Sequence, residues 1–430
     1  MEEEKNEDDV FTRETFDYGK DSGVEFITTK KGLMPVLISM ILIFISVAII
    51  LFFIFKTHVD EFNYIEALYI NKGDKSYNVI FHHSFLDSVE KIKVNGTKIN
   101  KNNNISFSKG KKKINVKIYF KEKLKVLDNL FYECDTLKEI YLDSLTTDEV
   151  ISASDMFYGC QNLEIINLGD FKSKKLNNIS NMFSGCEKLD YINVDIFKAG
   201  NIKDISGLFS NCSNLTKINL GEFNTKSVIN MSNLFSGCIS LTELNINKTK
   251  NFQTSNVKDM SYMFQNCHSL ENLNLNTMDT SNVIYMNNMF DSCENLQTLE
   301  INSFNTSSVI DMGEMFRNCK NLNNINILNF DVKNVEIMNS MFENCFELTF
   351  LNISNFETEK LQYANFFLNE CCQLYLIDLR KFNSLKLGND IVFFPKIFNN
   401  VTLIYNKTIF NLKIPKNWEE KDINNKSFHI

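Results

Sequence analysis

Ten cysteines stand at one fixed phase of an internal repeat, and they are the side chains most able to do chemistry in this chain. Each follows the previous one by 26 residues, except for one step of 29 residues. The ten are Cys134, Cys160, Cys186, Cys212, Cys238, Cys267, Cys293, Cys319, Cys345 and Cys371. Thiols in such a series can pair as disulfides, ligate a metal or pack as small apolar groups.

The residues around the cysteines favour buried, reduced thiols. A phenylalanine stands three residues before each of the first nine cysteines, and aliphatic residues stand three, six and eight residues after all ten. In the last unit Leu368 takes the phenylalanine position, with Phe367 beside it. We therefore expect a ladder of free thiols in an apolar core, with disulfides between neighbouring units as the alternative. Cys372 cannot face that core together with Cys371, so it is the expected reactive or intermolecular thiol.

Other chemistry has little support in the sequence. The five histidines, His58, His82, His83, His268 and His429, are scattered, and no zinc-binding spacing occurs among the cysteines. No nucleophile motif, phosphate-binding glycine loop or paired acid and base is found. We predict no metal, no cofactor and no enzymatic activity.

Two periods alternate within each unit, and they indicate the elements that position the cysteines. In the seventh unit, apolar residues recur at intervals of three and four, which is typical of a short helical segment: Val283, Met286, Met289, Phe290 and Cys293. Leu299 and Ile301 then alternate with polar neighbours, as in a short strand. A single unit cannot bury its own apolar face, so the units must stack into a solenoid with one continuous core.

The unit TSNVIYMNNMFDSCENLQTLEINSF resembles the 26-residue surface-protein repeat of BspA-like leucine-rich repeat proteins, which occur on bacterial and protist cells. The resemblance covers roughly Leu124 to Phe382. It implies a leucine-rich repeat solenoid at 124–382, of the α/β class, with a parallel sheet of about ten short strands and short helical segments. It also implies a surface or secreted protein, often linked to adhesion, and brings no catalytic residues.

An uncharged stretch at residues 33–55 is long enough to cross a bilayer as a helix. Lys20, Lys30 and Lys31 precede it and Lys56 follows it, so the positive-inside rule places residues 1–32 in the cytoplasm as an acidic tail. We predict a single transmembrane helix, an outward-facing solenoid and a location at the plasma membrane or cell surface. A secretory signal peptide is the rival interpretation.

The solenoid is flanked by two regions without the repeat. Residues 56–123 alternate apolar and polar side chains around Asn-Gly and Lys-Gly turns, which predicts a small β-rich cap next to the membrane. Residues 383–430 are predicted to form a C-terminal cap. Residues 91–125 contain twelve lysines and one acidic residue, Glu122, and such a stretch either binds anionic glycans or lipid headgroups or is only solvated. Nucleic acid is not an expected partner.

Residues seven positions after each cysteine should point away from the core, as should those two positions earlier. Most of these side chains are polar, but apolar ones gather at each end. The resulting ligand-binding candidates are Tyr141, Ile165, Tyr191, Phe350 and Leu376. Binding of a partner and packing against the caps both explain such patches. Among the twelve glycosylation sequons beyond residue 55, the most exposed candidates are Asn95, Asn104 and Asn247.

These observations together predict a membrane-anchored cell-surface leucine-rich repeat protein that binds a protein or glycan partner, as in adhesion or host and cell interaction. The first alternative is a structural surface-coat or spacer protein without a specific ligand. The second is an enzyme or receptor activity in the membrane-proximal domain. No particular oligomeric state is predicted.

Overall fold

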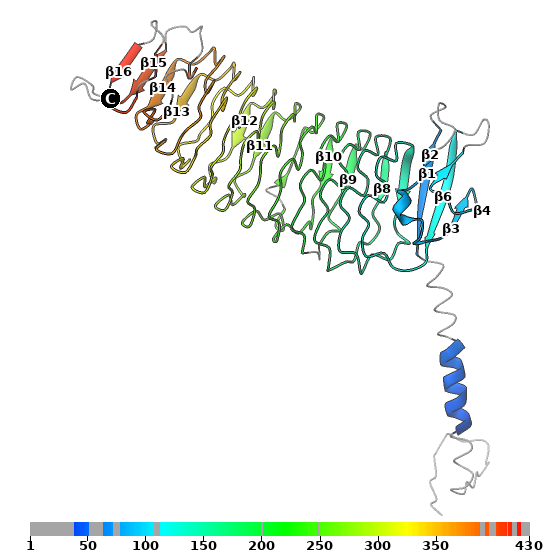
Figure 1. Cartoon of the computed structure of the whole chain (residues 1–430). Helices are drawn as coiled ribbons and strands as arrows, with labels where there is room; N and C mark the ends of the chain where they lie inside the picture. Colours follow the sequence, from blue (N-terminus) through cyan, green and yellow to red (C-terminus); the bar gives the residue numbers. More distant parts are fainter. Residues whose placement is uncertain are drawn as a thin grey trace, which may run out of the picture. The chain divides into compact units, whose positions relative to one another are not determined.

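The computed structural model describes residues 38–50, 63–71, 78–106, 112–198, 201–246, 249–387, 392–394, 401–410, 412–414 and 419–422. The chain forms two compact units, 1–61 and 62–430. In the first unit residues 38–50 are helical (Figure 1). Within the described ranges, no helix is both long enough and apolar enough to cross a bilayer. The predicted tail at 1–32 and both ends of the predicted span at 33–55 lie outside those ranges.

The second unit begins with an antiparallel sheet that is joined edge to edge to the solenoid (Figure 1). Its elements are β1 (Tyr64–Ile70), β2 (Asn78–Val79), η1 (His83–Phe85), β3 (Val89–Val94), β4 (Thr97–Ile99), β5 (Asn104–Ile105) and β6 (Lys113–Phe120). The main sheet has the order β4-β3-β6-β1-β7-β8, so β1 pairs antiparallel with β6 on one side and with β7, the first solenoid strand, on the other. The N-terminal sheet therefore lengthens the solenoid sheet and does not cover its outer face.

Each of the ten cysteines marks one rung of the solenoid, and eight of the rungs contain an assigned strand. The strands are β7 (Leu137–Tyr141), β8 (Ile165–Asn167), β9 (Tyr191–Asn193), β10 (Lys217–Asn219), β11 (Asn272–Asn274), β12 (Thr298–Glu300), β13 (Phe350–Asn352) and β14 (Leu376–Leu379). Paired strands are parallel and one repeat apart in register, as with Ile140 opposite Ile166. The expected solenoid with a parallel sheet is confirmed.

The predicted helical segment of each unit is wrong. Every rung has two residues with positive φ, one five positions and one directly before the cysteine, such as Asn181 (52°) and Gly185 (73°). A left-handed residue every four positions cannot continue an α-helix. The segment is instead a series of tight turns, in which Cys186 N–H donates to the Phe183 carbonyl and Phe183 N–H donates to Leu208 of the next rung.

The core is a ladder of stacked rings. The nine phenylalanines from Phe131 to Phe342 stack in successive pairs, with ring centroids 5.3–6.0 Å apart and planes within 17° of parallel. All nine are fully buried. Each inner ring therefore contacts the rungs on both sides, which is how one residue type per repeat produces a continuous core.

The parallel ladder continues past Phe382. The strand β15 (Thr402–Tyr405) pairs with β14 at the same 26-residue offset, and β16 (Glu419–Asp422) pairs with β15. Phe393 stacks on Phe367 with ring centroids 4.8 Å apart, so the ring ladder also continues. The C-terminal region thus extends the solenoid by further parallel strands.

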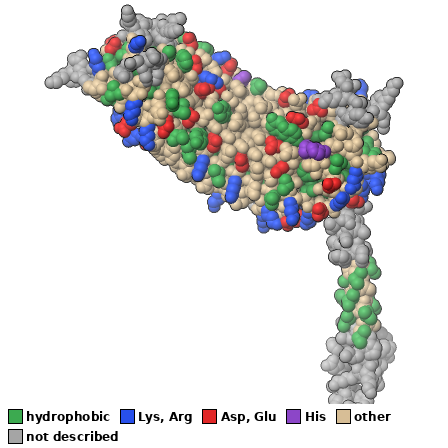
Figure 2. Space-filling model, viewed as in Figure 1, with side chains coloured by type: hydrophobic (Ala, Val, Ile, Leu, Met, Phe, Trp, Pro, Cys, Tyr) green, Lys and Arg blue, Asp and Glu red, His purple; other side chains and the backbone are tan. Residues whose placement is uncertain are grey.

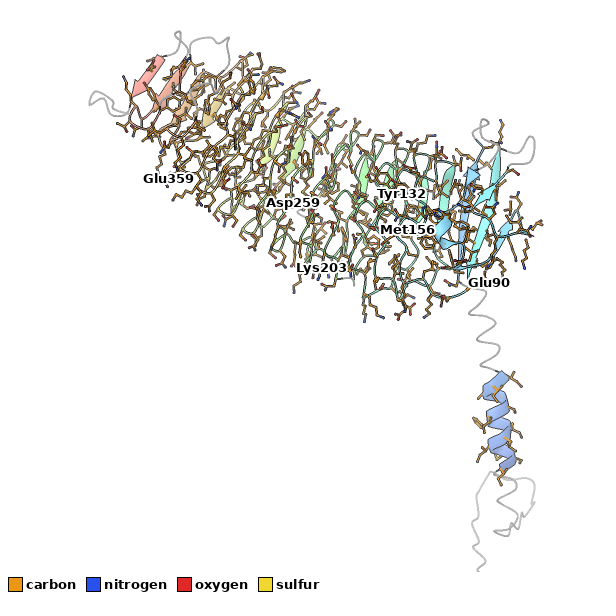
Figure 3. All side chains as sticks on the ribbon, in the orientation of Figure 1. Glu90, Tyr132, Met156, Lys203, Asp259 and Glu359 are labelled. Carbon is orange, nitrogen blue, oxygen red and sulfur yellow. The ribbon has the colours of Figure 1, made fainter. Side chains whose placement is uncertain are left out.

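Charge is unevenly spread over the solenoid surface. Figure 2 shows lysine and arginine side chains gathered along the lower edge, whereas the middle of the visible face is largely uncharged. Lys203 and Glu359, both exposed, lie along that edge (Figure 3). The large uncharged surface reflects the asparagine, serine and threonine of the repeat.

Candidate functional site

The ten repeat cysteines are fully buried free thiols, as predicted. From Cys160 onward, each of these Sγ atoms donates to the phenylalanine carbonyl of the preceding rung, at 2.9–3.4 Å. That carbonyl already accepts the backbone N–H of the cysteine in its own rung, so the thiol uses its second lone pair. Burial raises the pKa of the Cys212 thiol from 9.0 to about 12. These thiols therefore have a structural role and are not nucleophiles.

Cys372 is exposed, in agreement with its expected position. Desolvation, together with the negative charge of Glu370, raises the pKa of the Cys372 thiol. A raised pKa lowers the fraction of thiolate, which is the reactive form. Its surroundings thus work against the predicted reactivity.

Tyr141, Ile165 and Tyr191 lie on the outer sheet face in three successive rungs, on β7, β8 and β9. Their exposed fractions are 36%, 47% and 49%. Glu139 of β7 is the register partner of Ile165, and the Tyr141 hydroxyl donates to its carboxylate at 3.1 Å. Because β1 meets β7 edge to edge, the N-terminal sheet leaves these side chains uncovered. Packing against that cap does not account for them. We call these three residues the apolar cluster.

Phe350 and Leu376 form a second pair at the other end of the face. They are register partners on β13 and β14, and both are half-buried. Several rungs separate them from the apolar cluster, so the structure does not combine the five candidates into one site. The N-terminal group exposes more apolar surface.

Polar side chains bond to one another along the middle of the outer face. The Asn219 amide donates to Asn193 Oδ1 at 3.0 Å, and the Asn326 amide donates to Asn302 Oδ1 at 2.9 Å. Amides that satisfy one another in this way stabilise the stack and offer fewer free groups to a ligand. The middle of the face is therefore mainly structural.

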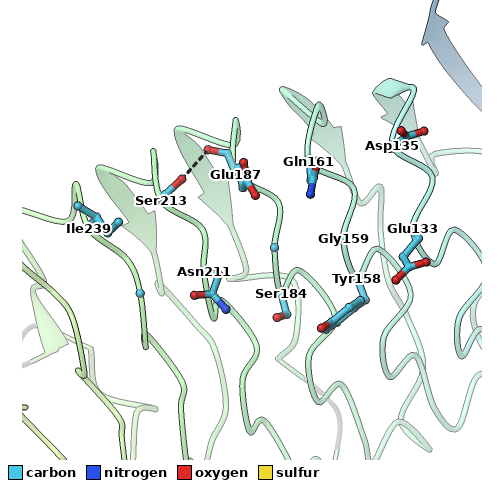
Figure 4. A pocket seen from close by; sticks show the side chains of 12 residues that line it. Glu133, Asp135, Tyr158, Gly159, Gln161, Ser184, Glu187, Asn211, Ser213 and Ile239 are labelled. Carbon is cyan, nitrogen blue, oxygen red and sulfur yellow. Dashed lines mark hydrogen bonds between the residues drawn. The ribbon is translucent and has the colours of Figure 1, made fainter. Parts of the chain in front are cut away.

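A groove crosses the first five rungs on the side of the solenoid that carries the turns before and after the cysteines (Figure 4). Its volume is about 640 Å³. Carboxylates of Glu133, Asp135 and Glu187 line it together with Tyr158, and no lysine or arginine does. Tyr158 stacks on Tyr132 at 5.0 Å, within 7° of parallel. In Figure 4 the far side of Tyr158 is next to Ser184, a small side chain that leaves room beside the ring.

Glycine in the position before the cysteine opens this groove. Gly159, Gly185 and Gly237 have φ of 69°, 73° and 73°, a region that glycine adopts without strain. A Cβ at Gly185 would lie 3.3 Å from the Gly159 Cα, and one at Gly237 would lie within hydrogen-bonding distance of Asn211 Oδ1. Sequence reasoning missed the groove. Its signal is the recurrence of glycine at one phase of the second, third and fifth units.

In the later rungs the same surface is filled by a polar network. Asp291, with a side chain 2% exposed, accepts two hydrogen bonds from the Arg317 guanidinium at 2.9 Å and one from the Gln265 amide at 3.0 Å. The Asp291 carboxylate raises the pKa of Arg317. Asn318, in the position that glycine takes in the groove, also donates to Asp291 and Ser292.

The glycosylation candidates differ in setting. Asn95 is exposed at a hairpin tip, where its Oδ1 accepts from the Asn115 N–H at 3.0 Å. Asn104 is half-buried and donates to Asn103 Oδ1. Asn247 lies outside the described residues. The described residues also contain no group of three or more histidine, cysteine or acidic side chains placed to hold a metal ion.

Comparison with known proteins assigns the repeat to a family. A family model described as "Mycoplasma protein of unknown function, DUF285" matches residues 101–195, 187–298 and 268–376. No curated protein matches the chain. A leucine-rich repeat protein from Bacteroides ovatus ATCC 8483, of known structure, is 18% identical, with a TM-score of 0.31, over 73% of this chain and 80% of that chain. The family match therefore carries the assignment.

Proposed function

The chain belongs to the family described as Mycoplasma protein of unknown function, DUF285, and we propose that it is a membrane-anchored cell-surface protein that binds a protein or glycan partner. Residues 33–55 are its proposed anchor, with residues 1–32 in the cytoplasm and the solenoid outside. The 23 uncharged residues of that stretch and the preceding lysines support this topology.

The apolar cluster is the observation that carries the binding proposal. Three large apolar side chains, each 36–49% exposed, stand in successive rungs beside a face that is otherwise polar. Such a patch costs solvation free energy in the unbound protein, and a sheet that only needed to stack has no use for it. A spacer protein without a ligand would be expected to carry asparagine here, as the neighbouring rungs do.

Binding is tested with arrays of purified glycans and extracellular-matrix proteins. The wild-type chain should bind at least one array member, and the triple variant Tyr141→Ser/Ile165→Ser/Tyr191→Ser should lose that binding by about tenfold or more. The control variant, Asn219→Ser/Asn245→Ser, changes polar positions of the same face and should bind like wild type. Equal binding by all three proteins would exclude the apolar cluster.

The topology is tested separately on intact cells. An epitope placed after Ile430 should be reachable by antibody, and one placed before Glu25 should not. Proteolysis of intact cells should remove the solenoid and spare the N-terminal epitope. Antibody access to the N-terminal epitope alone would contradict the proposed orientation.

A further inference from the structure

Charge is divided sharply between the N-terminal sheet and the solenoid. Residues 62–123 contain 13 lysines and 5 acidic residues, whereas residues 124–430 contain 26 basic and 36 acidic residues. The N-terminal sheet region is therefore strongly basic in a chain whose formal net charge is −8. A concentrated positive field of this kind attracts anionic partners and speeds their encounter.

Strand register places the lysines on one face. Lys93 of β3 lies opposite Lys98 of β4 and Lys117 of β6, and directly opposed residues share a face. Lys117 in turn lies opposite Glu66 of β1, which lies opposite Tyr141 of β7. One row thus runs across five strands from Lys98 to Tyr141. The lysine face, defined by Lys91, Lys93, Lys98, Lys113 and Lys117, is continuous with the outer face of the solenoid.

Tyrosine rings beneath the lysines hold their side chains outward. Lys91 Nζ lies 4.4 Å from the centroid of the Tyr119 ring, and Lys117 Nζ lies 4.9 Å from that of Tyr64. The two rings pack on each other at 5.1 Å. Cation–π contact and burial of the aliphatic stems restrict the ammonium groups to one layer. A partner therefore meets a pre-ordered layer of ammonium groups.

The lysines gather at one end of the sheet. No acidic residue occurs between Lys91 and Lys121 in the sequence. Lys113 lies opposite Ile70, at the far end of β1 from Tyr64, where the chain enters the sheet. Seven residues of strand separate these ends by about 24 Å. The most basic end is thus remote from the point where residues 33–55 connect, which favours a partner in solution over the lipids around that segment.

We infer that the lysine face binds an anionic polysaccharide that carries carboxylate or sulfate groups along its chain. The row of Lys98, Lys93 and Lys117 crosses strands about 4.8 Å apart, so its charges form a line that an extended polyanion can follow. Exposed amides of Asn95 and Asn115 lie beside it and can bond sugar hydroxyls. The inference rests on the proposed surface location but not on the apolar cluster.

The test uses the full-length protein in neutral detergent and immobilised dextran sulfate, hyaluronan and uncharged dextran. Wild type should bind both polyanions, more weakly as salt rises, and should not bind dextran. The variant Lys93→Gln/Lys98→Gln/Lys113→Gln should raise the Kd for dextran sulfate by about tenfold or more. These three lysines form no salt bridge with described residues, so the variant should keep the wild-type melting temperature.

A matched variant removes the same charge elsewhere. Lys203→Gln/Lys226→Gln/Lys258→Gln alters exposed solenoid lysines and should change the Kd less than about twofold. Equal losses in the two triple variants, or no binding of wild type to either polyanion, would overturn the inference. So would tighter binding to phosphatidylglycerol vesicles or to polyglutamate than to the polysaccharides. The Tyr141→Ser/Ile165→Ser/Tyr191→Ser variant should still bind dextran sulfate, which separates this inference from the proposed function.

Discussion

The first five and last five rungs of the solenoid have the same core and different surfaces. Stacked phenylalanines and buried thiols repeat through both halves with little change in geometry. On the turn side, however, the first half has a glycine-lined groove, and the second half has the network around Asp291 and Arg317. On the sheet side, the first half has the apolar cluster. The repeat therefore fixes what stacking requires, and the outward positions are free to differ.

Alkaline unfolding should give the largest effect, because it acts on the thiol ladder in both halves. Burial raises the folded-state pKa of these thiols above the unfolded value of 9.0, to about 12 for Cys212. The stability they contribute is complete below pH 9 and is lost as pH rises toward 12, by roughly 1.4 kcal/mol per thiol per pH unit. Thiolate absorbance at 240 nm and circular dichroism should therefore change together.

Cys372→Ser removes the exposed thiol and serves as the background for this titration. Thiolate absorbance that develops near pH 9 while the dichroism stays constant would show that the ladder is accessible to solvent.

Equivalent phenylalanines in the two halves should be equally important. Phe183 and Phe316 each stack between two other phenylalanines. Phe183→Ala and Phe316→Ala should each lower the free energy of unfolding by about 3–5 kcal/mol, since both leave a cavity in the core. Urea unfolding of residues 62–430 measures both. A difference of more than about 2 kcal/mol would contradict a uniform core.

The network around Asp291 should distinguish the halves. Asp291→Ala removes the bidentate partner of Arg317, which is about one-third exposed and keeps Glu314, so we expect a loss of about 1–3 kcal/mol. Ser184 occupies the same repeat position in the first half, and Ser184→Ala should cost less than about 0.5 kcal/mol. Equal losses in thermal unfolding would mean that this surface is equivalent in both halves.

A reciprocal exchange tests the glycine position. Gly185→Asn introduces a Cβ close to the Gly159 backbone at φ 73°, which asparagine tolerates, so we expect a loss of about 1 kcal/mol. Asn318→Gly gives up hydrogen bonds to Asp291 and Ser292 and should cost a similar amount. A stabilising Gly185→Asn would show that the groove is not closely constrained by the neighbouring rung.

The smallest effect is expected on the outer sheet face. Asn245 is exposed and bonds only Glu243 within its own rung among the described residues. Asn245→Ser should change the free energy of unfolding by less than about 0.5 kcal/mol. A loss comparable with that of Phe183→Ala in the same urea experiment would mean that the assignment of inward and outward positions is wrong.

Sequence alone determined which side chains face the core. The 26-residue spacing places Phe183, Cys186 and Leu189 at fixed phases, and all three are buried. A position that recurs in every unit must meet its own copies when units stack, so burial follows from the period. The outward direction of Tyr141 and Ile165 follows from strand alternation in the same way.

The tertiary structure alone decided how the backbone turns and how the ends join. Apolar residues at intervals of three and four are common to a helix and to successive turns, and the left-handed residues at Asn181 and Gly185 decide between them. The insertion of β1 between β6 and β7 is a long-range pairing that no local pattern encodes. It leaves the apolar cluster uncovered, and it brings the lysine face and the solenoid face onto one surface.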